Sequence, residues 1–205
     1  AKDAITVVEY FDTEKLEVVR LANADCHFAY RESVFKQELK GRAIILAVEF
    51  RLSRVAKPNL GYGDVIKEVE ARGGATLDNI REAICSIRGS KLPDPKVLGN
   101  AGSFFKNPIV GCEVAERLLA QYPDMPRYAV SGDDAKVKLA AGWLIDKAGL
   151  KGYRCGNVGV HDRQALVLVN HGGATGGEVI HLAEYVCQRV KDSFGVEISP
   201  EVNIL

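Results

Sequence analysis

Residues 99–108 read Gly-Asn-Ala-Gly-Ser-Phe-Phe-Lys-Asn-Pro, a block of small, polar and charged residues around an aromatic pair. Glycine lets a backbone approach a ligand closely because no Cβ intervenes. Pro108 cannot donate to a strand ladder, so any strand here is expected to be short or at a sheet edge. We interpret the block as a glycine loop that presents the hydroxyl of Ser103, a candidate proton donor. The alternative interpretation is an ordinary tight turn before a buried Phe-Phe pair.

Three segments ahead of this block are rich in β-branched residues, which is typical of strands. They cover residues 4–11, 16–21 and 43–52. Residues 12–15, between the first two, predict a hairpin turn. Together the three segments predict the antiparallel part of a sheet.

Two helices are predicted between these strands and the block, where apolar residues recur with a helical period. The first begins with Asp64 as N-cap and ends at Arg72, and the second begins with Thr76 and ends at Gly89. Prolines at 93 and 95 then fix an extended connector. We place a domain boundary there, with residues 1–92 in one domain and 93–205 in the next.

The rest of the chain mixes helices and strands. Helices are predicted at 112–121, 138–148 and 177–193, and strands at 153–160, 164–169 and 196–205. Since there is no regular β-α-β alternation, the predicted fold class is α+β rather than a doubly wound sheet. The glycine run at 172–177 lacks the Lys-Ser/Thr ending of a phosphate loop, so it is interpreted as a turn before the last helix.

Composition limits the function classes. The 205 residues are 47% hydrophobic, and 27 basic residues balance 27 acidic ones, which gives no support to a nucleic-acid-binding or membrane-surface protein. Five cysteines without Cys-x-x-Cys pairing predict free, mostly buried thiols in a reducing compartment. The four histidines have no partners at metal-ligand spacing, so no metal site is predicted.

Charged residues elsewhere in the chain offer companions to Ser103. If Ser103 protonates a carbon atom, the preceding intermediate is electron-rich, and the planar guanidinium of Arg31 could hold a carboxylate beside it. Glu201 is an acid at the start of an expected strand. Lysines 91, 106 and 138 flank glycine or proline segments and would suit a diphosphate, although ordinary surface charge is the alternative at each. The residues alone predict a two-domain α+β protein with an anion site.

Residues 91–108, Lys-Leu-Pro-Asp-Pro-Lys-Val-Leu followed by the block quoted above, closely resemble the signature of the UDP-N-acetylenolpyruvoylglucosamine reductase family (MurB). These flavoenzymes make UDP-N-acetylmuramate for bacterial peptidoglycan. Further matches lie at residues 30–33, 62–64, 138–146, 161–170 and 200–202, so the resemblance covers essentially the whole chain. It implies the remainder of an FAD-contacting antiparallel sheet domain, followed by an α+β substrate-binding domain.

The resemblance also implies roles at the matching positions. Ser103 is implied to protonate the α-carbon of an enolpyruvyl ether whose carboxylate is flanked by Arg31 and Glu201. The implied substrate contacts are Tyr62, Lys91, Asn107, Tyr128, Lys138 and Gln164. The implied protein is a cytoplasmic, monomeric, FAD-dependent NADPH oxidoreductase acting on UDP-N-acetylglucosamine enolpyruvate, with no nucleic-acid or membrane partner.

One departure from the family pattern concerns the flavin. The family holds the FAD pyrophosphate with a glycine-rich loop that lies before the start of this sequence, and residues 1–97 contain no equivalent. We therefore expect a carboxy-terminal portion of a reductase that, alone, binds FAD poorly and is inactive. The alternatives are a non-redox UDP-sugar-binding fragment and a flavin oxidase of the same structural group acting on another substrate.

Overall fold

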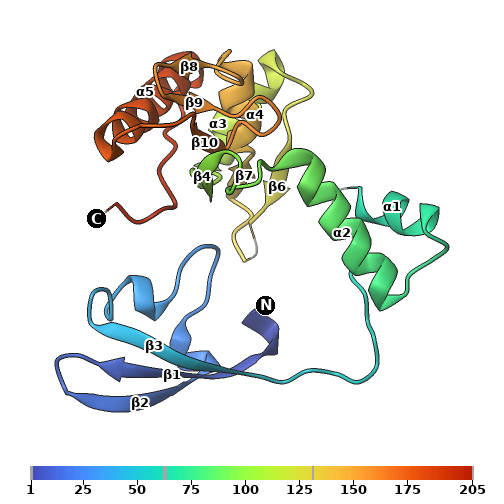
Figure 1. Cartoon of the computed structure of the whole chain (residues 1–205), viewed down its shortest axis with the longest axis vertical. Helices are drawn as coiled ribbons and strands as arrows, with labels where there is room; N and C mark the ends of the chain where they lie inside the picture. Colours follow the sequence, from blue (N-terminus) through green and yellow to red (C-terminus); the bar gives the residue numbers. More distant parts are fainter. Residues whose placement is uncertain (1, 62–63, 131, 205) are drawn as a thin grey trace. The chain divides into compact units, whose positions relative to one another are not determined.

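A computed structural model describes residues 2–61, 64–130 and 132–204 (Figure 1). Its internal contacts divide the chain into two units, Ala1–Asn59 and Leu60–Leu205. Helices and antiparallel sheets are combined, which confirms the predicted α+β class. The domain boundary predicted between residues 92 and 93 is a different division and stays a prediction. Among the described residues, no helix is both long and apolar enough to span a membrane.

The first unit is a three-stranded antiparallel sheet. Its strands are β1 (Ile5–Asp12), β2 (Glu17–Ala22) and β3 (Ala43–Phe50), in the order β2-β1-β3, so the three predicted strands are confirmed. Short 3-10 turns lie at Lys2–Ala4, Asn23–Cys26 and Val34–Lys36. Val8 and Tyr10 of the central strand are buried, and the Tyr10 ring meets Phe35 edge-on with centroids 5.6 Å apart.

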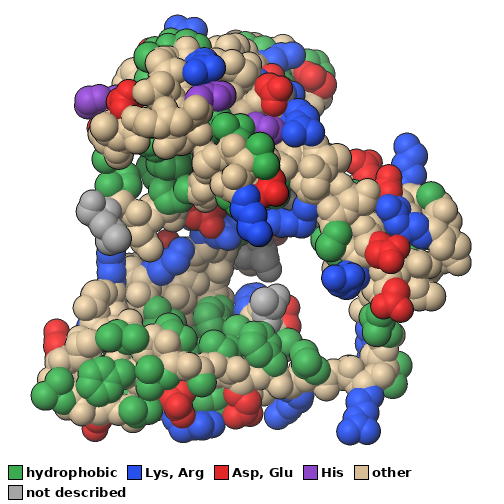
Figure 2. All heavy atoms as spheres, in the orientation of Figure 1, with side chains coloured by type: hydrophobic (Ala, Val, Ile, Leu, Met, Phe, Trp, Pro, Cys, Tyr) green, Lys and Arg blue, Asp and Glu red, His purple; other side chains and the backbone are tan. Residues whose placement is uncertain are grey.

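Strand β3 carries an exposed apolar surface. Ile44, Ile45, Leu46, Val48 and Phe50 are each between 38% and 55% exposed. Figure 2 shows hydrophobic side chains gathered over this sheet. An apolar edge strand of this kind is typical of a surface that packs against further protein.

A buried ion pair closes the β1–β2 hairpin. The Asp12 carboxylate is 1% exposed and accepts from Arg42 Nε at 2.7 Å and from Arg42 Nη2 at 2.6 Å. Its Oδ1 also accepts from the backbone N–H groups of Glu14 and Lys15, at 3.0 and 3.1 Å. The Arg42 guanidinium, helped by these N–H groups, holds the pKa of the Asp12 carboxyl well below its usual range.

This ion pair predicts an acid-sensitive hairpin. Because the folded-state pKa of Asp12 is depressed, its contribution to stability is complete above the unfolded pKa of about 4 and is lost as pH falls below that value. Hydrogen exchange of the β1 amides, corrected for intrinsic rates, should show opening become easier from about pH 5 to about pH 3. In Asp12→Asn the same amides should open more easily at neutral pH and depend less on pH. An equal pH dependence in both proteins would contradict this assignment.

The second unit begins with two helices, α1 (Val65–Ala71) and α2 (Leu77–Lys91), which confirms both predicted helices. The Thr76 hydroxyl accepts from the Asn79 N–H at 3.1 Å, so the predicted N-cap of α2 is correct. The Asp64 side chain makes no such cap. The predicted end at Gly89 is wrong, because the helical hydrogen bonds continue until Leu92 N–H donates to the Arg88 carbonyl.

Two further antiparallel sheets lie in this unit (Figure 1). One has the order β4-β10-β9-β8, with strands Gly99–Ser103, Val167–Asn170, Val158–Val160 and Arg154–Cys155. The other has the order β5-β7-β6, with strands Ile109–Gly111, Lys136–Leu139 and Arg127–Ala129. The remaining helices are α3 (Cys112–Gln121), α4 (Ala141–Lys147) and α5 (Gly176–Phe194).

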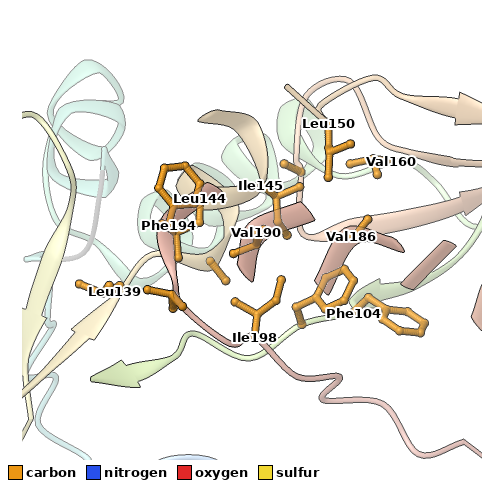
Figure 3. Close-up of a cluster of buried hydrophobic side chains, with 14 of the residues drawn as sticks. Phe104, Leu139, Leu144, Ile145, Leu150, Val160, Val186, Val190, Phe194 and Ile198 are labelled. Atoms are coloured by element: carbon orange, nitrogen blue, oxygen red, sulfur yellow. The ribbon is translucent and has the colours of Figure 1, made fainter. Parts of the chain in front are cut away.

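The apolar core of the second unit lies where α3, α4 and α5 meet these sheets (Figure 3). Leu144, Ile145, Val186 and Val190 are fully buried there. Helix α5 begins with a capping box between Thr175 and Glu178, so the predicted turn at 172–177 is confirmed as a helix start.

Three further sequence predictions in this unit are wrong. Gly99–Ser103 is an edge strand rather than a loop, although the expectation of a short or edge strand is confirmed. The helix predicted from 138 begins only at Ala141, because Lys138 and Leu139 pair within β7. The strand predicted at 196–205 is not found, because residues 196–204 form no strand. In this segment an isolated β-bridge joins Pro200 to Phe105.

The cysteines also differ from prediction. All five are free thiols, as expected, but Cys26 is the buried one, while Cys85 and Cys155 are exposed and two are half-buried. The prediction of mostly buried thiols is therefore wrong.

Candidate active site

Ser103 and Glu201 lie on neighbouring backbone segments although they are far apart in the sequence. Ser103 ends β4, where it pairs with Val167 of β10. The next residue, Phe104, accepts the Glu201 N–H through its carbonyl at 2.8 Å. The Lys106 N–H donates to the Ser199 carbonyl at 2.9 Å, so the two segments run side by side. The structure thus brings two of the three predicted catalytic residues together.

Local structure holds the Ser103 side chain outside the core. Phe104 and Phe105, which follow it, are 4% and 1% exposed, with ring centroids 5.2 Å apart. Gly102, which precedes it, has φ +71, a conformation that other residues adopt only with strain. The Gly102 N–H donates to Asn100 Oδ1 at 3.0 Å. An anchored aromatic pair on one side and a fixed glycine on the other leave Ser103 exposed.

Arg31 lies in the first unit, in a tight turn between Ala29 and Glu32. The Ala29 N–H donates to the Glu32 carbonyl at 3.0 Å, and Lys36 Nζ donates to the Arg31 carbonyl at 3.2 Å. Arg31 has φ +58, which is strained for a residue with a side chain and is often found at functional sites. The guanidinium carbon lies 6.0 Å from the centre of the Tyr30 ring. Its role beside Ser103 stays a prediction.

Three predicted substrate residues line one cavity of about 310 Å³ in the second unit: Asn107, Tyr128 and Gln164. Lys138 is the cross-strand partner of Tyr128, and its Nζ lies 5.5 Å from the centre of that ring. Lys91 ends α2, with its Nζ 3.6 Å from Asp64 Oδ2. Tyr62 lies outside the described residues.

The walls of this cavity come from α4 and from the turn between β9 and β10. Asn107 Oδ1 accepts from the Ala141 N–H at 2.9 Å, which ties its side chain to the start of α4. A Cβ on Gly142 would come within 3.4 Å of Gln164 Oε1 and 3.3 Å of Leu166 Cγ, so glycine permits this close approach. Trp143 joins the cavity to the core, because its ring meets Tyr122 edge-on at 5.6 Å.

The sequence did not indicate three other cavity residues, Trp143, Lys151 and Arg163. Lys151 Nζ pairs with Asp146 Oδ2 at 3.0 Å, and Arg163 Nη1 donates to the Ser90 carbonyl at 2.9 Å. Asp146 also lines the cavity and balances Lys151, so Arg163 and the neighbouring Lys138 supply the net positive charge, which suits an anionic ligand. Within the described parts of the chain, no group of His, Cys, Asp or Glu side chains could hold a metal ion.

Similarity to known proteins covers the whole chain. Residues 94–205 match the family model of the UDP-N-acetylenolpyruvoylglucosamine reductase C-terminal domain. A relative of that name from Chromobacterium violaceum is 58% identical over 191 residues, which are 92% of this chain and 55% of the relative. One from Neisseria meningitidis serogroup C is 52% identical over 208 residues, covering 100% of this chain and 60% of the relative. The chain therefore spans between 55% and 60% of the length of these relatives.

A solved structure gives the same picture of the fold. The crystal structure of the reductase MurB from Thermus caldophilus matches 98% of this chain and 53% of its own, with a TM-score of 0.57 and 24% identity. That likeness supports the fold alone. The family resemblance indicated by residues 91–108 is confirmed by the family model and the relatives. The chain belongs to the UDP-N-acetylenolpyruvoylglucosamine reductase (MurB) family.

Proposed function

We propose that the protein containing this chain reduces the enolpyruvyl ether of UDP-N-acetylglucosamine enolpyruvate to a lactyl ether, a step in peptidoglycan precursor synthesis. In this proposal the chain supplies the substrate pocket and the proton donor. The observation that supports it is the convergence of Asn107, Tyr128 and Gln164 on one cavity, with Lys138 beside Tyr128. The relatives of this chain carry the name of that reductase.

The cavity suits a uridine diphosphate sugar chemically. Tyr128 is 49% exposed and offers a flat apolar face to a base or sugar. Lys138, Lys151 and Arg163 offer cationic donors that match phosphate oxygens. Gln164 adds an amide, which can both donate and accept.

Ser103 is proposed to donate the proton that completes reduction. Hydride addition to the β-carbon of the enolpyruvyl group places negative charge on the α-carbon and carboxylate. An alcohol is a weak acid, but this acceptor is strongly basic, so a positioned hydroxyl can protonate it. Arg31 and Glu201 are proposed to flank the carboxylate, where the guanidinium stabilises the developing charge.

FAD, when bound, would supply the hydride, taken from NADPH. The residues of the first unit do not fit a complete flavin site, and the glycine run before α5 in the second unit lacks the ending of a phosphate loop. The described residues of the first unit contain one glycine, Gly41, and their helical segments are 3-10 turns of three or four residues. A pyrophosphate cradle normally needs a glycine-rich turn before a helix. We therefore propose that residues outside this chain hold most of the flavin, and that the exposed apolar surface of β3 packs against that part of the protein.

Calorimetry on this chain tests whether it binds the UDP-sugar without holding the flavin. Titration with UDP-N-acetylglucosamine enolpyruvate should give saturable binding, and Gln164→Ala should weaken it by about tenfold because a buried polar contact is lost. The control Val18→Ala, which changes an exposed residue of β2 that does not line the cavity, should bind like wild type. The purified chain should show no flavin absorption band and no NADPH oxidation.

Two results would contradict the proposal. A yellow chain with a flavin band would show that these residues hold the cofactor by themselves. Absence of heat with the UDP-sugar, in a chain whose circular dichroism shows it folded, would show that the cavity is not its site.

A further inference from the structure

We infer that His161 is a positioning residue of the substrate pocket: its imidazole fixes the turn that places Arg163 and Gln164 in the pocket wall. This inference rests on the proposed function, because the pocket matters only if it binds the UDP-sugar. His161 does not line that cavity itself. It acts through the two residues that follow in its turn.

The turn joins β9, which ends at Val160, to β10, which begins at Val167. His161 is 5% exposed, and its Nδ1 accepts from the backbone N–H of Arg163 at 3.3 Å and of Gln164 at 3.2 Å. The backbone N–H of His161 also donates to the Val167 carbonyl at 2.9 Å, which closes the base of the turn. The imidazole therefore forms the centre around which the turn is folded.

Both residues held in this way have a second contact in the site. Arg163 Nη1 donates to the Ser90 carbonyl at 2.9 Å, at the end of α2 beside Lys91. The Gln164 carboxamide lies against Gly142 of α4, and its Oε1 accepts from the Leu166 N–H at 3.5 Å. A change in the turn would thus move one cationic side chain and one amide in the cavity together.

The contact requires a neutral imidazole with its proton on Nε2, because Nδ1 accepts. Nε2 lies 3.4 Å from Asp162 Oδ1. Burial lowers the pKa of His161, with a smaller contribution from Arg163, while Asp162 opposes them. Arg88 and Asp94 are the charged residues that line a neighbouring cavity with His161 and Arg163. A proton on Nδ1 would leave both backbone donors without their acceptor.

The test uses the full-length holoenzyme. His161→Ala removes the acceptor and should raise KM for the UDP-sugar by about tenfold, with kcat changed by less than about threefold. His161→Asn places an amide oxygen close to the position of Nδ1 and should restore KM to within about threefold of wild type. Because burial lowers the pKa of His161, the ratio of wild-type KM to the Asn variant's KM should stay constant above the ordinary histidine pKa of about 6.5 and rise only as pH falls below it, since the amide does not titrate.

Val190→Ala serves as the destabilising control. Val190 is fully buried in α5 and does not line the pocket, so this change should lower the melting temperature and leave KM unchanged. The inference is overturned if His161→Ala behaves like Val190→Ala, or if His161→Asn is no better than His161→Ala. Turnover by the wild-type enzyme reports on the proposed function separately, and its absence would overturn both.

Discussion

Replacing Ser103 with alanine in the full-length enzyme is expected to lower kcat for UDP-N-acetylglucosamine enolpyruvate by at least about 100-fold. Loss of a properly placed general acid typically costs this much. The hydroxyl lies at the exposed end of β4, directly before the phenylalanine pair that anchors the strand. Substrate affinity should change by less than about threefold, because the pocket residues and the core beneath them are untouched.

Two controls isolate proton donation. NADPH-dependent flavin bleaching should be normal in Ser103→Ala, since that half-reaction needs no proton on the substrate carbon. Ser199→Ala removes another exposed serine, whose backbone carbonyl accepts from Lys106 and remains in place, and it should retain wild-type kcat. Normal turnover in Ser103→Ala would show that another group is the acid.

The block at 99–108 shows how far local sequence can predict a strand. Pro108 correctly predicted that any strand here would be short or at a sheet edge, but it did not show that one forms. β4 exists because β10, more than 60 residues later, offers it hydrogen-bond partners from Ser103↔Val167 to Gly99↔Asn170. A partner so distant in sequence leaves no local signal.

Competition between local and distant interactions also explains the misplaced start of α4. Lys138 and Leu139 fit the helical period that continues from Ala141 onward. They instead lie between β5 and β6, where Leu139 is fully buried. Cross-strand pairing and burial override a weak helical preference of two residues.

The sequence predicted those site residues that lie within motifs shared with the family. Ser103 was a candidate proton donor from its own block, whereas Asn107 and Gln164 were identified through the resemblance, and the structure then placed these two on one cavity. Arg163 was missed because its contribution depends on the turn around His161 and on Ser90, an ordinary residue in α2. Such contacts between remote segments have no sequence motif.

The largest stability effect is expected from Phe105→Ala, which should lower the free energy of unfolding of the second unit by about 3–5 kcal/mol. Phe105 is 1% exposed, and its ring packs 5.2 Å from that of Phe104. Its backbone also bridges to Pro200, next to Glu201. The void left by the missing ring would therefore loosen the contact that holds the carboxy-terminal segment beside Ser103. Activity of the full-length enzyme should fall as well.

Urea unfolding followed by Trp143 fluorescence measures this effect in the right part of the molecule, because Trp143 is the single tryptophan of the chain and lies in the second unit. Ile109→Ala is the matched control. Ile109 follows the same block but is 43% exposed, so its truncation should cost less than about 1 kcal/mol. If both variants lose the same stability, Phe105 is not the anchor of this segment, and the position of Ser103 must depend on the β4–β10 pairing alone.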